Sequence, residues 1–271
     1  MIGKWIILLA SIFSASHLLA GPLAGSAPVP GGVVWLTVAD ATTPLPQVTY
    51  NGKPVAVIKQ NQHWVAVAGL PLSSQSGHHE VRVNGKGISF QVTDKDYPEQ
   101  HIQLKTRKHI DLSAEDLARH RKEKAKAKAV FKHFDTAQLP DLAFLKPVEG
   151  PYSSPFGLKR FFNGEPRNPH SGLDIAAPTG TPIKSPSPGK VVLTGNFFFN
   201  GNVVYVDHGQ GVISMFCHLD SIGVKEGDQL HKGQVLGKVG ATGRVTGPHL
   251  HWSVSLNNAR IDPMLLLPKE N

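Results

Sequence analysis

Cysteine is nearly missing from this chain of 271 residues, in which Cys217 is the single example. One cysteine cannot form an internal disulfide, so stability has to come from packing and, where a site allows it, from a bound metal. The same scarcity excludes a structural zinc site built as a cage of thiolates. Because no cysteine follows the N-terminal apolar run, a lipid-modified N-terminus is excluded as well.

Acidic residues are fewer than basic residues, 20 against 28, which gives a formal net charge of +8. A basic chain suits an anionic partner such as a nucleic acid, a membrane surface or an acidic polymer, although ordinary surface charge is an equally good interpretation. Charged residues make up 18% of the chain and hydrophobic residues 40%, so the bulk of it should fold. Its length is comfortable for two domains.

An apolar run at residues 5–13 follows Lys4 and precedes small residues that end at Ala20. The run is too short to span a bilayer comfortably, which takes about 20 residues. It predicts a signal peptide over residues 1–20 and export to the periplasm or cell envelope, with no stable membrane insertion after cleavage. An uncleaved N-terminal anchor is the alternative. Export argues against nucleic acid as a partner.

The N-terminal half has the pattern of a small β domain. Residues 21–32 are rich in Gly, Pro, Ser and Ala and are predicted to be a flexible lead. Residues 33–106 alternate apolar and polar positions over short stretches separated by turns, which predicts a β-sandwich. Asn84-Gly85 predicts a hairpin between two of these stretches. Four histidines in this region show no ligand spacing and are interpreted as exposed polar residues: His63, His78, His79 and His101.

Residues 107–141 are predicted to form a linker helix. Ser113 is suited to cap its N-terminus, and the first turn that follows is acidic. Cations then dominate, among them Lys122, Lys124, Lys126 and Lys128. A solvated helix face is a commoner explanation than a nucleic-acid-binding arm. Residues 142–271 return to short strands and predict a compact, mostly antiparallel β domain, so the predicted fold class is mostly β.

Three motifs in the C-terminal half contain histidine. His170 and Asp174 belong to the first, which is predicted to be a loop entering a strand. His249 and His251 lie two residues apart on a predicted strand and therefore face the same side. His218 ends another apolar strand. Zinc in catalytic sites takes three protein ligands, often imidazole nitrogen and carboxylate oxygen, and leaves a fourth position to water. Each motif is weak alone, but together they fit a catalytic zinc site better than a structural one.

In their order, the motifs resemble the lysostaphin-type (LytM) zinc peptidases. The matching stretches are HSGLDIAAP at 170–178, VDHG at 206–209, HL at 218–219 and TGPHLH at 246–251. The resemblance extends over about residues 143–268. A β-sandwich and a helix ahead of such a domain resemble one exported bacterial branch of that family.

The resemblance implies that His170, Asp174 and His251 hold one zinc ion per chain and that His218 and His249 are the catalytic pair. It implies no other cofactor. The function implied is that of an exported zinc metalloendopeptidase that hydrolyses peptide cross-links of bacterial peptidoglycan. Because all five positions are filled, the chain does not look like a degenerate relative. The alternative is a non-catalytic module of the same fold that binds the cell wall or activates amidases.

Two positions depart from the family pattern. Phe216 stands where tyrosine is common and Ser253 where an acidic residue is common, which affects contacts behind the site residues. Strand alternation predicts that Cys217 points away from His218 and is a buried, inert thiol, not the nucleophile of a Cys-His hydrolase.

Other features have structural interpretations or stay open. We expect His208 and His231 to be structural, and the run at residues 197–199 to be either core or an aromatic side of the substrate groove. Residues 33–140 hold no catalytic motif, and we expect them either to cover the zinc groove or to recruit the enzyme to an anionic surface. The sequence predicts neither the cross-link that is cut nor an oligomeric state.

Overall fold

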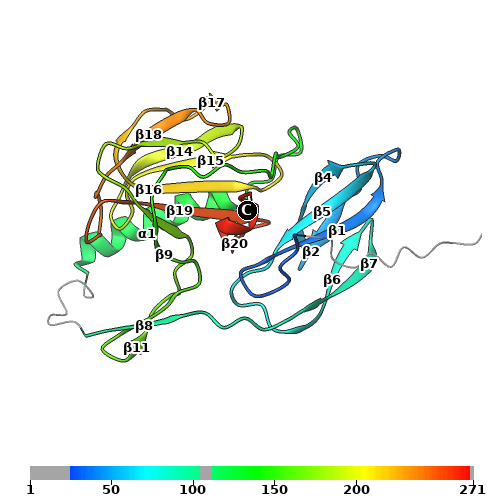
Figure 1. Ribbon diagram of the computed structural model, residues 1–271, viewed down its shortest axis with the longest axis horizontal. Coiled ribbons are helices and arrows are strands. Elements are labelled where there is room, and N and C mark those ends of the chain that lie inside the picture. The colour runs from blue at the N-terminus through cyan, green and yellow to red at the C-terminus, as the bar shows by residue number, and fades with distance from the viewer. Residues whose placement is uncertain (1–24, 104–111, 269–271) are drawn as a thin grey trace, which may run out of the picture.

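The computed structural model describes residues 25–103 and 112–268. The export signal that we predict over residues 1–20 lies outside the described residues. The described chain is mostly β and its strand pairs are antiparallel with one exception, which confirms the predicted fold class. Figure 1 shows an N-terminal β part (blue to cyan) beside a larger C-terminal β part (green to red). No helix among the described residues is long and apolar enough to cross a membrane.

The N-terminal part is a small β-sandwich. One sheet has the strand order β1-β5-β4 and the other the order β3-β2-β6-β7. Asn84 and Gly85 have φ angles of 47° and 85°, as a two-residue hairpin between β6 and β7 requires. The strands are β1 (Val33–Asp40), β2 (Val48–Tyr50), β3 (Lys53–Pro54), β4 (Ala56–Gln60), β5 (His63–Gly69), β6 (Gly77–Val83) and β7 (Lys86–Val92).

The sheet β1-β5-β4 is buried on both faces. One face fills the sandwich core together with Tyr50 and Phe90 of the opposite sheet. The other face joins the core of the C-terminal part, and the Asn257 side chain bonds both backbone groups of Gly69, at 2.6 and 3.0 Å. A shared apolar core therefore holds the two parts together. The sandwich residues in it are Val33, Ala56, Val65 and Val67.

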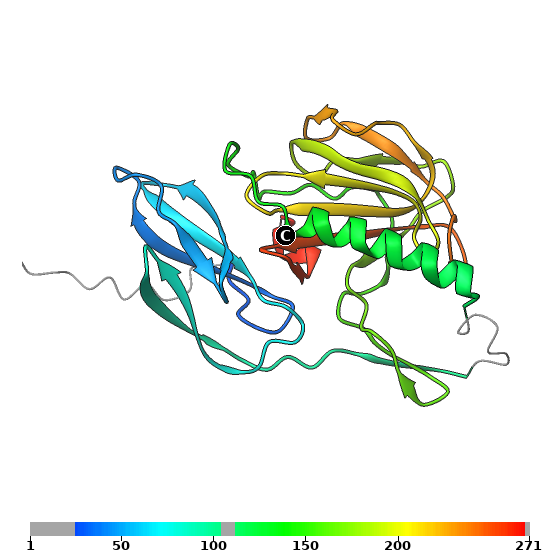
Figure 2. The same cartoon turned by 180° about the vertical axis from the view of Figure 1, so that it is seen from behind.

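The helix α1 (Ala114–Lys132) packs on the sheet of the C-terminal part (Figure 2). The Ser113 hydroxyl accepts a hydrogen bond from the Asp116 amide at 3.0 Å, so the predicted N-cap is present. Phe131 is buried against Tyr205 of the sheet, with ring centroids 5.5 Å apart. The lysines of the helix lie outside this packed face and are exposed. The helix is thus a docked layer of the C-terminal part.

The C-terminal part is built on a sheet with the order β17-β14-β15-β16-β19-β12-β9. Additional strands pair with its members, and the apolar core includes Phe216 and Trp252. The elements are β9 (Tyr152–Ser154), β12 (Leu173–Ala176), β13 (Pro182–Lys184), β14 (Gly189–Phe197), β15 (Gly201–Asp207), β16 (Ile213–Ile222), β17 (Gln229–Leu230), β18 (Val235–Val239), β19 (His249–Leu256), β20 (Ala259–Ile261) and the 3-10 helix η1 (Pro263–Leu266).

A further sheet, of three strands, connects the two parts a second time. It has the order β11-β10-β8, with β8 (Glu99–Ile102), β10 (Lys159–Phe162) and β11 (Glu165–Pro166). The pair β8–β10 is parallel, and β8 belongs to the segment that leaves the sandwich. Figure 1 shows this segment running beneath the sheet of the C-terminal part.

Candidate metal centre and catalytic histidines

Three neighbouring strands and one loop bring the five predicted site residues together. Asp174 on β12 is the direct cross-strand partner of His251 on β19, so the two side chains project from one face of the sheet. His249 lies two residues from His251 and shares that face. His170 ends the loop that precedes β12. His218 comes from β16, the neighbour of β19 on the other side.

Three polar atoms converge at the centre of the cluster. His170 Nε2 lies 3.1 Å from Asp174 Oδ1, and His251 Nδ1 lies 2.8 Å from the same oxygen. The two imidazole nitrogens are 3.0 Å apart. Among the described residues, these three form the one group of histidine, cysteine and acidic side chains with the spacing of a metal site.

Hydrogen bonds behind the imidazoles fix where their protons are. His170 Nδ1 donates to the carbonyl of Pro155 at 2.8 Å, which leaves a lone pair on Nε2. The Ser253 hydroxyl donates to Ser171 O at 2.9 Å, so it accepts from His251 Nε2 at 3.0 Å and leaves a lone pair on His251 Nδ1. Both lone pairs are directed at a carboxylate oxygen, which is also an acceptor. This donor set needs a cation.

The geometry fits zinc. Metal–ligand bonds of about 2.0–2.1 Å in a tetrahedron place the ligand atoms about 3.3 Å from one another. The three separations here, from 2.8 to 3.1 Å, are shorter than that value by about half an ångström at most. Burial lowers the pKa of His251, so a neutral imidazole faces an ionised carboxylate.

The two remaining histidines lie beside this centre. The ring centroids of His218 and His249 are 4.9 Å apart, and His249 Nε2 is 3.9 Å from Asp174 Oδ1. His218 Nδ1 donates to Thr242 O and His249 Nδ1 donates to Gly247 O, each at 2.9 Å. Both Nε2 atoms are therefore proton acceptors in the neutral rings. Burial, reinforced by His251, lowers the pKa of His218 to about 4.

An irregularity in β16 turns His218 toward the site. His218 has a φ of 64°, in the left-handed region, and β16 has one residue more than β15 between Phe216 and Leu219. Such a bulge redirects a side chain. Simple alternation therefore fails here: Cys217 is the cross-strand partner of His251 and projects from the same face of the sheet.

Cys217 is nevertheless buried, as predicted. Its exposed fraction is 0%, and it packs in a cluster with Phe131 and Tyr205. Asn200 donates to its sulfur at 3.3 Å. Burial raises the pKa of the thiol to about 12, which leaves it protonated at neutral pH. Cys217 is therefore an inert packing residue, although its side chain projects from the same face of the sheet as His251.

The groups that orient the five site residues were largely beyond sequence reasoning. Thr242, Gly247 and Pro155 act through backbone carbonyls, which any residue would supply, so no signal existed. Ser253 is the exception: the sequence singled it out as a departure from the family pattern, and it lies two residues after His251 on the same face of a strand, where it contacts that ring.

Other predicted residues lie apart from the cluster. His208 is buried between the Pro188 carbonyl, at 2.8 Å, and the Ser214 hydroxyl, at 2.9 Å. His231 is exposed. Of the four histidines between residues 33 and 106, His79 is half-buried and bonds Tyr50, whereas the other three are exposed: His63, His78 and His101. The aromatic run divides, because Phe197 is core and Phe199 is half-buried against the Arg244 guanidinium, 4.3 Å away.

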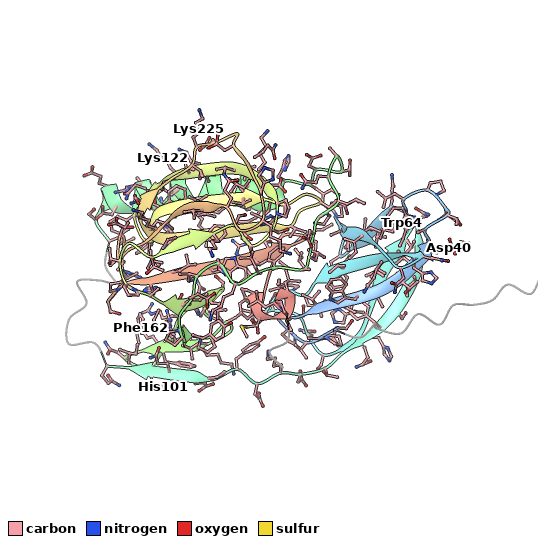
Figure 3. All side chains as sticks on the ribbon, turned by 45° about the horizontal axis from the view of Figure 1, so that its top comes forward. Asp40, Trp64, His101, Lys122, Phe162 and Lys225 are labelled. Carbon is pink, nitrogen blue, oxygen red and sulfur yellow. The ribbon has the colours of Figure 1, made fainter. Side chains whose placement is uncertain are left out.

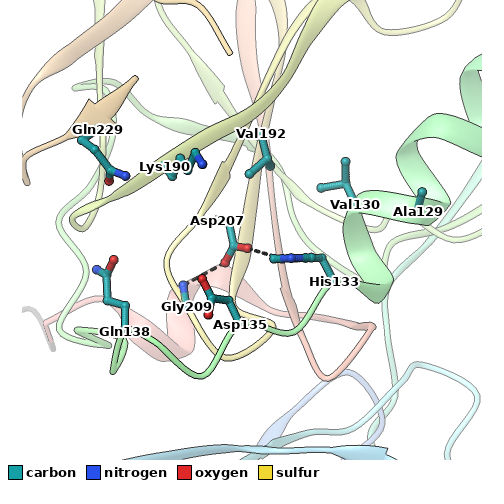
Figure 4. Close-up of a pocket in the computed structure, with 10 residues that line it drawn as sticks. All are labelled: Ala129, Val130, His133, Asp135, Gln138, Lys190, Val192, Asp207, Gly209 and Gln229. Atoms are coloured by element: carbon teal, nitrogen blue, oxygen red, sulfur yellow. Dashed lines mark hydrogen bonds and ion pairs between the residues drawn. The ribbon is translucent and has the colours of Figure 1, made fainter. Parts of the chain in front are cut away.

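A cavity of ≈ 420 Å³ lies where α1 ends against β14 and β15. Figure 4 shows Asp207 at its centre, paired with His133 at 2.7 Å and accepting the Gly209 amide at 2.8 Å. None of the five site residues lines this cavity. The His133–Asp207 pair attaches the end of the helix to the sheet.

The chain belongs to peptidase family M23. Residues 168–263 match the model of peptidase family M23, and residues 26–95 match that of the M23 N-terminal domain. A Pseudomonas aeruginosa protein whose crystal structure is described as that of a peptidase M23 is 46% identical. The alignment covers 89% of this chain and 95% of that one, with a TM-score of 0.74. The resemblance to lysostaphin-type peptidases and the predicted enzyme class are confirmed.

Curated relatives share the catalytic region. Peptidoglycan DD-endopeptidase ShyA of Vibrio cholerae is 42% identical over 96 residues, which are 35% of this chain and 22% of ShyA. DD-carboxypeptidase/endopeptidase Mpg of Neisseria meningitidis is 38% identical over 112 residues, 41% of this chain and 26% of Mpg. The matched region is thus about a quarter of the length of these relatives.

Proposed function

We propose that this chain is a zinc metalloendopeptidase that hydrolyses peptide cross-links of bacterial peptidoglycan. The observation that carries the proposal is the convergence of two imidazole lone pairs on an ionised carboxylate, with two further histidines beside them. The names of ShyA and Mpg support the peptide-bond chemistry and the substrate class.

In this proposal His170, Asp174 and His251 hold the zinc ion. The bound metal would supply Lewis-acid chemistry, polarising the scissile carbonyl and lowering the pKa of water toward about 7. The protein's part is to keep both imidazoles neutral and oriented, which the Pro155 carbonyl and the Ser253 hydroxyl do.

His218 and His249 are proposed to move the protons. Each ring has its Nδ1 proton committed to a backbone carbonyl, so Nε2 is the reactive atom. One Nε2 accepts the proton of the attacking water and passes it to the leaving amine. The other takes up a proton from solvent and, as an imidazolium, donates a hydrogen bond to the oxyanion that develops on the scissile carbonyl.

The proposed substrate agrees with the charge of the chain and with the predicted export. Peptidoglycan carries carboxylates, and this chain has a formal net charge of +8. Action on sacculi places the enzyme in the periplasm or cell envelope. Export is testable by fractionating cells and sequencing the N-terminus of the mature protein.

The decisive experiment digests purified sacculi with zinc-loaded protein and identifies new termini by mass spectrometry. We expect paired amino and carboxyl termini at peptide cross-links, and roughly 10²-fold fewer, or fewer still, in the same time with the matched variant His249→Ala. Zinc-loaded, folded protein that releases no peptide termini would overturn the proposal. It would favour the non-catalytic module, which predicts binding to sacculi without turnover.

A further inference from the structure

The loop that carries His170 is attached to the N-terminal part of the chain. Residues 155–170 leave the catalytic sheet, form the β10–β11 hairpin and return with His170. An isolated two-stranded hairpin is marginally stable in water at best. The third strand, β8, comes from the segment that leaves the sandwich, so the catalytic part does not complete this sheet by itself.

The strand pairing is supported by contacts at both ends. The Lys159 amide donates to Pro98 O at 2.9 Å, and the Asn163 amide donates to Ile102 O at 3.0 Å. Between them the His101 ring stacks on Phe161, with centroids 4.5 Å apart and planes 6° from parallel. Figure 3 shows His101 and Phe162 on these neighbouring strands.

Tyr97, just before β8, holds the start of the loop. Its ring meets the buried Phe156 edge-on, with centroids 6.1 Å apart, and its hydroxyl donates to Pro30 O at 2.7 Å. The ring also covers Gly157, which has a φ of 82°, so closely that any Cβ there would collide with it. Tyr97 therefore joins Pro30, which precedes the first strand of the sandwich, to the first residues of the loop 155–170.

The same loop residues hold His170 directly. The Gly157 amide donates to His170 O at 2.8 Å, and the His170 amide donates to Leu158 O at 2.9 Å. Pro155 O accepts the ring proton of His170 at 2.8 Å. The backbone position and the imidazole orientation of this ligand thus depend on residues 155–158, of which Phe156 and Gly157 contact Tyr97.

We infer that Tyr97 is a positioning residue of the zinc site, through which the N-terminal part preorganises His170 as a ligand. This inference depends on the proposed zinc site. With the loop held in place, zinc meets a formed ligand set. Without Tyr97, part of the binding free energy is spent on ordering residues 155–170.

The test compares zinc affinity in Tyr97→Ala and Tyr97→Phe, in the full chain without residues 1–20. Dissociation constants are measured by competition with a chelator, well below the Tm of each variant. We expect Tyr97→Ala to bind zinc about 10- to 100-fold more weakly, the loss found when groups supporting a metal ligand are removed. Tyr97→Phe keeps the ring and should remain close to wild type.

Phe90→Ala is the matched control, because it removes a buried ring from the sandwich core. It should lower Tm and leave zinc affinity unchanged. Wild-type affinity in folded Tyr97→Ala, or an equal loss in Phe90→Ala, would overturn the inference. If Tyr97→Ala does not fold, the zinc affinity of Tyr97→Leu is measured instead and judged in the same way. Failure of the zinc site itself gives a different result, in which the wild type binds no zinc or His170→Ala binds it as tightly.

Discussion

Asp174 and His251 face each other across β12 and β19, with Asp174 Oδ1 2.8 Å from His251 Nδ1. His170 Nε2 completes the triangle at 3.1 Å from the same carboxylate oxygen. Because both nitrogens present lone pairs, the three atoms repel one another unless a cation lies between them. Zinc binding should therefore stabilise the fold as well as prepare the site.

The first prediction concerns metal content. His170→Ala, Asp174→Ala and His251→Ala should each lose the zinc ion that the wild type holds at one per chain, because two ligands are too few. Elemental analysis after dialysis measures this. His231→Ala, which changes an exposed histidine outside the cluster, should keep its zinc. Full zinc content in the three ligand variants would show the assignment to be wrong.

The second prediction separates catalysis from metal binding. His218→Ala and His249→Ala should keep zinc and fold but lose turnover by roughly 10²–10⁴-fold, the contribution of a positioned proton-transfer group. Rates on a soluble cross-linked peptide and zinc content on the same samples check this. Stoichiometric zinc loss in either variant would move that histidine to the ligand set.

The third prediction concerns Cys217→Ser. Since the thiol is buried and its pKa is raised to about 12, it should supply no nucleophile, and the variant should keep turnover of the wild-type order. The serine hydroxyl can still accept from Asn200, so a modest fall in Tm is expected. Abolished turnover with zinc and fold intact would support a cysteine mechanism.

Much of this site followed from the sequence, because its spacing is local. Side chains two residues apart on a strand point to the same face. This alone places His249 and His251 together, whatever the fold. The five-residue set required the family resemblance, since His170 and His251 are far apart in the chain. The side chains now found in contact agree with it, although the assigned roles stay predictions.

The remaining features depend on long-range packing. Alternation alone placed Cys217 and His218 on opposite faces, and only the bulge, seen in the pairing of β15 with β16, shows why both reach one face. The parallel pairing of β8 with β10 joins segments some sixty positions apart, Glu99 with Lys159. No local sequence pattern predicts such a contact.

The fourth prediction concerns acid stability. Burial lowers the pKa of His208 to about 4 from an ordinary 6.5. Between these values the unfolded chain binds the proton more readily, so the stabilisation is complete above pH 6.5 and is lost as pH falls toward 4. At most it amounts to roughly 3 kcal/mol.

The measurement is the free energy of unfolding against pH, with chelator present throughout. His208→Gln should be less stable than wild type at pH 7 but should lose less stability on acidification. The carboxylates titrate in both proteins, so their effect cancels in the comparison. Parallel curves for the two proteins would contradict the prediction.

The last prediction concerns the N-terminal half and α1. The sandwich packs at the Leu256 end of β19, whereas the site histidines lie at its other end, so its described contacts favour recruitment over cover of the groove. Lys124, Lys126 and Lys128 are exposed on α1, and none of them appears in a described ion pair. Exposed charges act over about 8 Å at physiological ionic strength, so binding through them should weaken with salt.

Replacing these three lysines with glutamine removes three charges and preserves helix propensity. The matched control removes three exposed lysines from the sandwich: Lys53, Lys59 and Lys86. We expect the helix variant to bind and digest sacculi more slowly at low salt, to lose that difference at high salt, and to cleave a soluble peptide at the wild-type rate. The control should behave as wild type in all three assays. Equal defects in both variants would mean that total charge matters and not the helix, and no defect in either would leave α1 as a packing element alone.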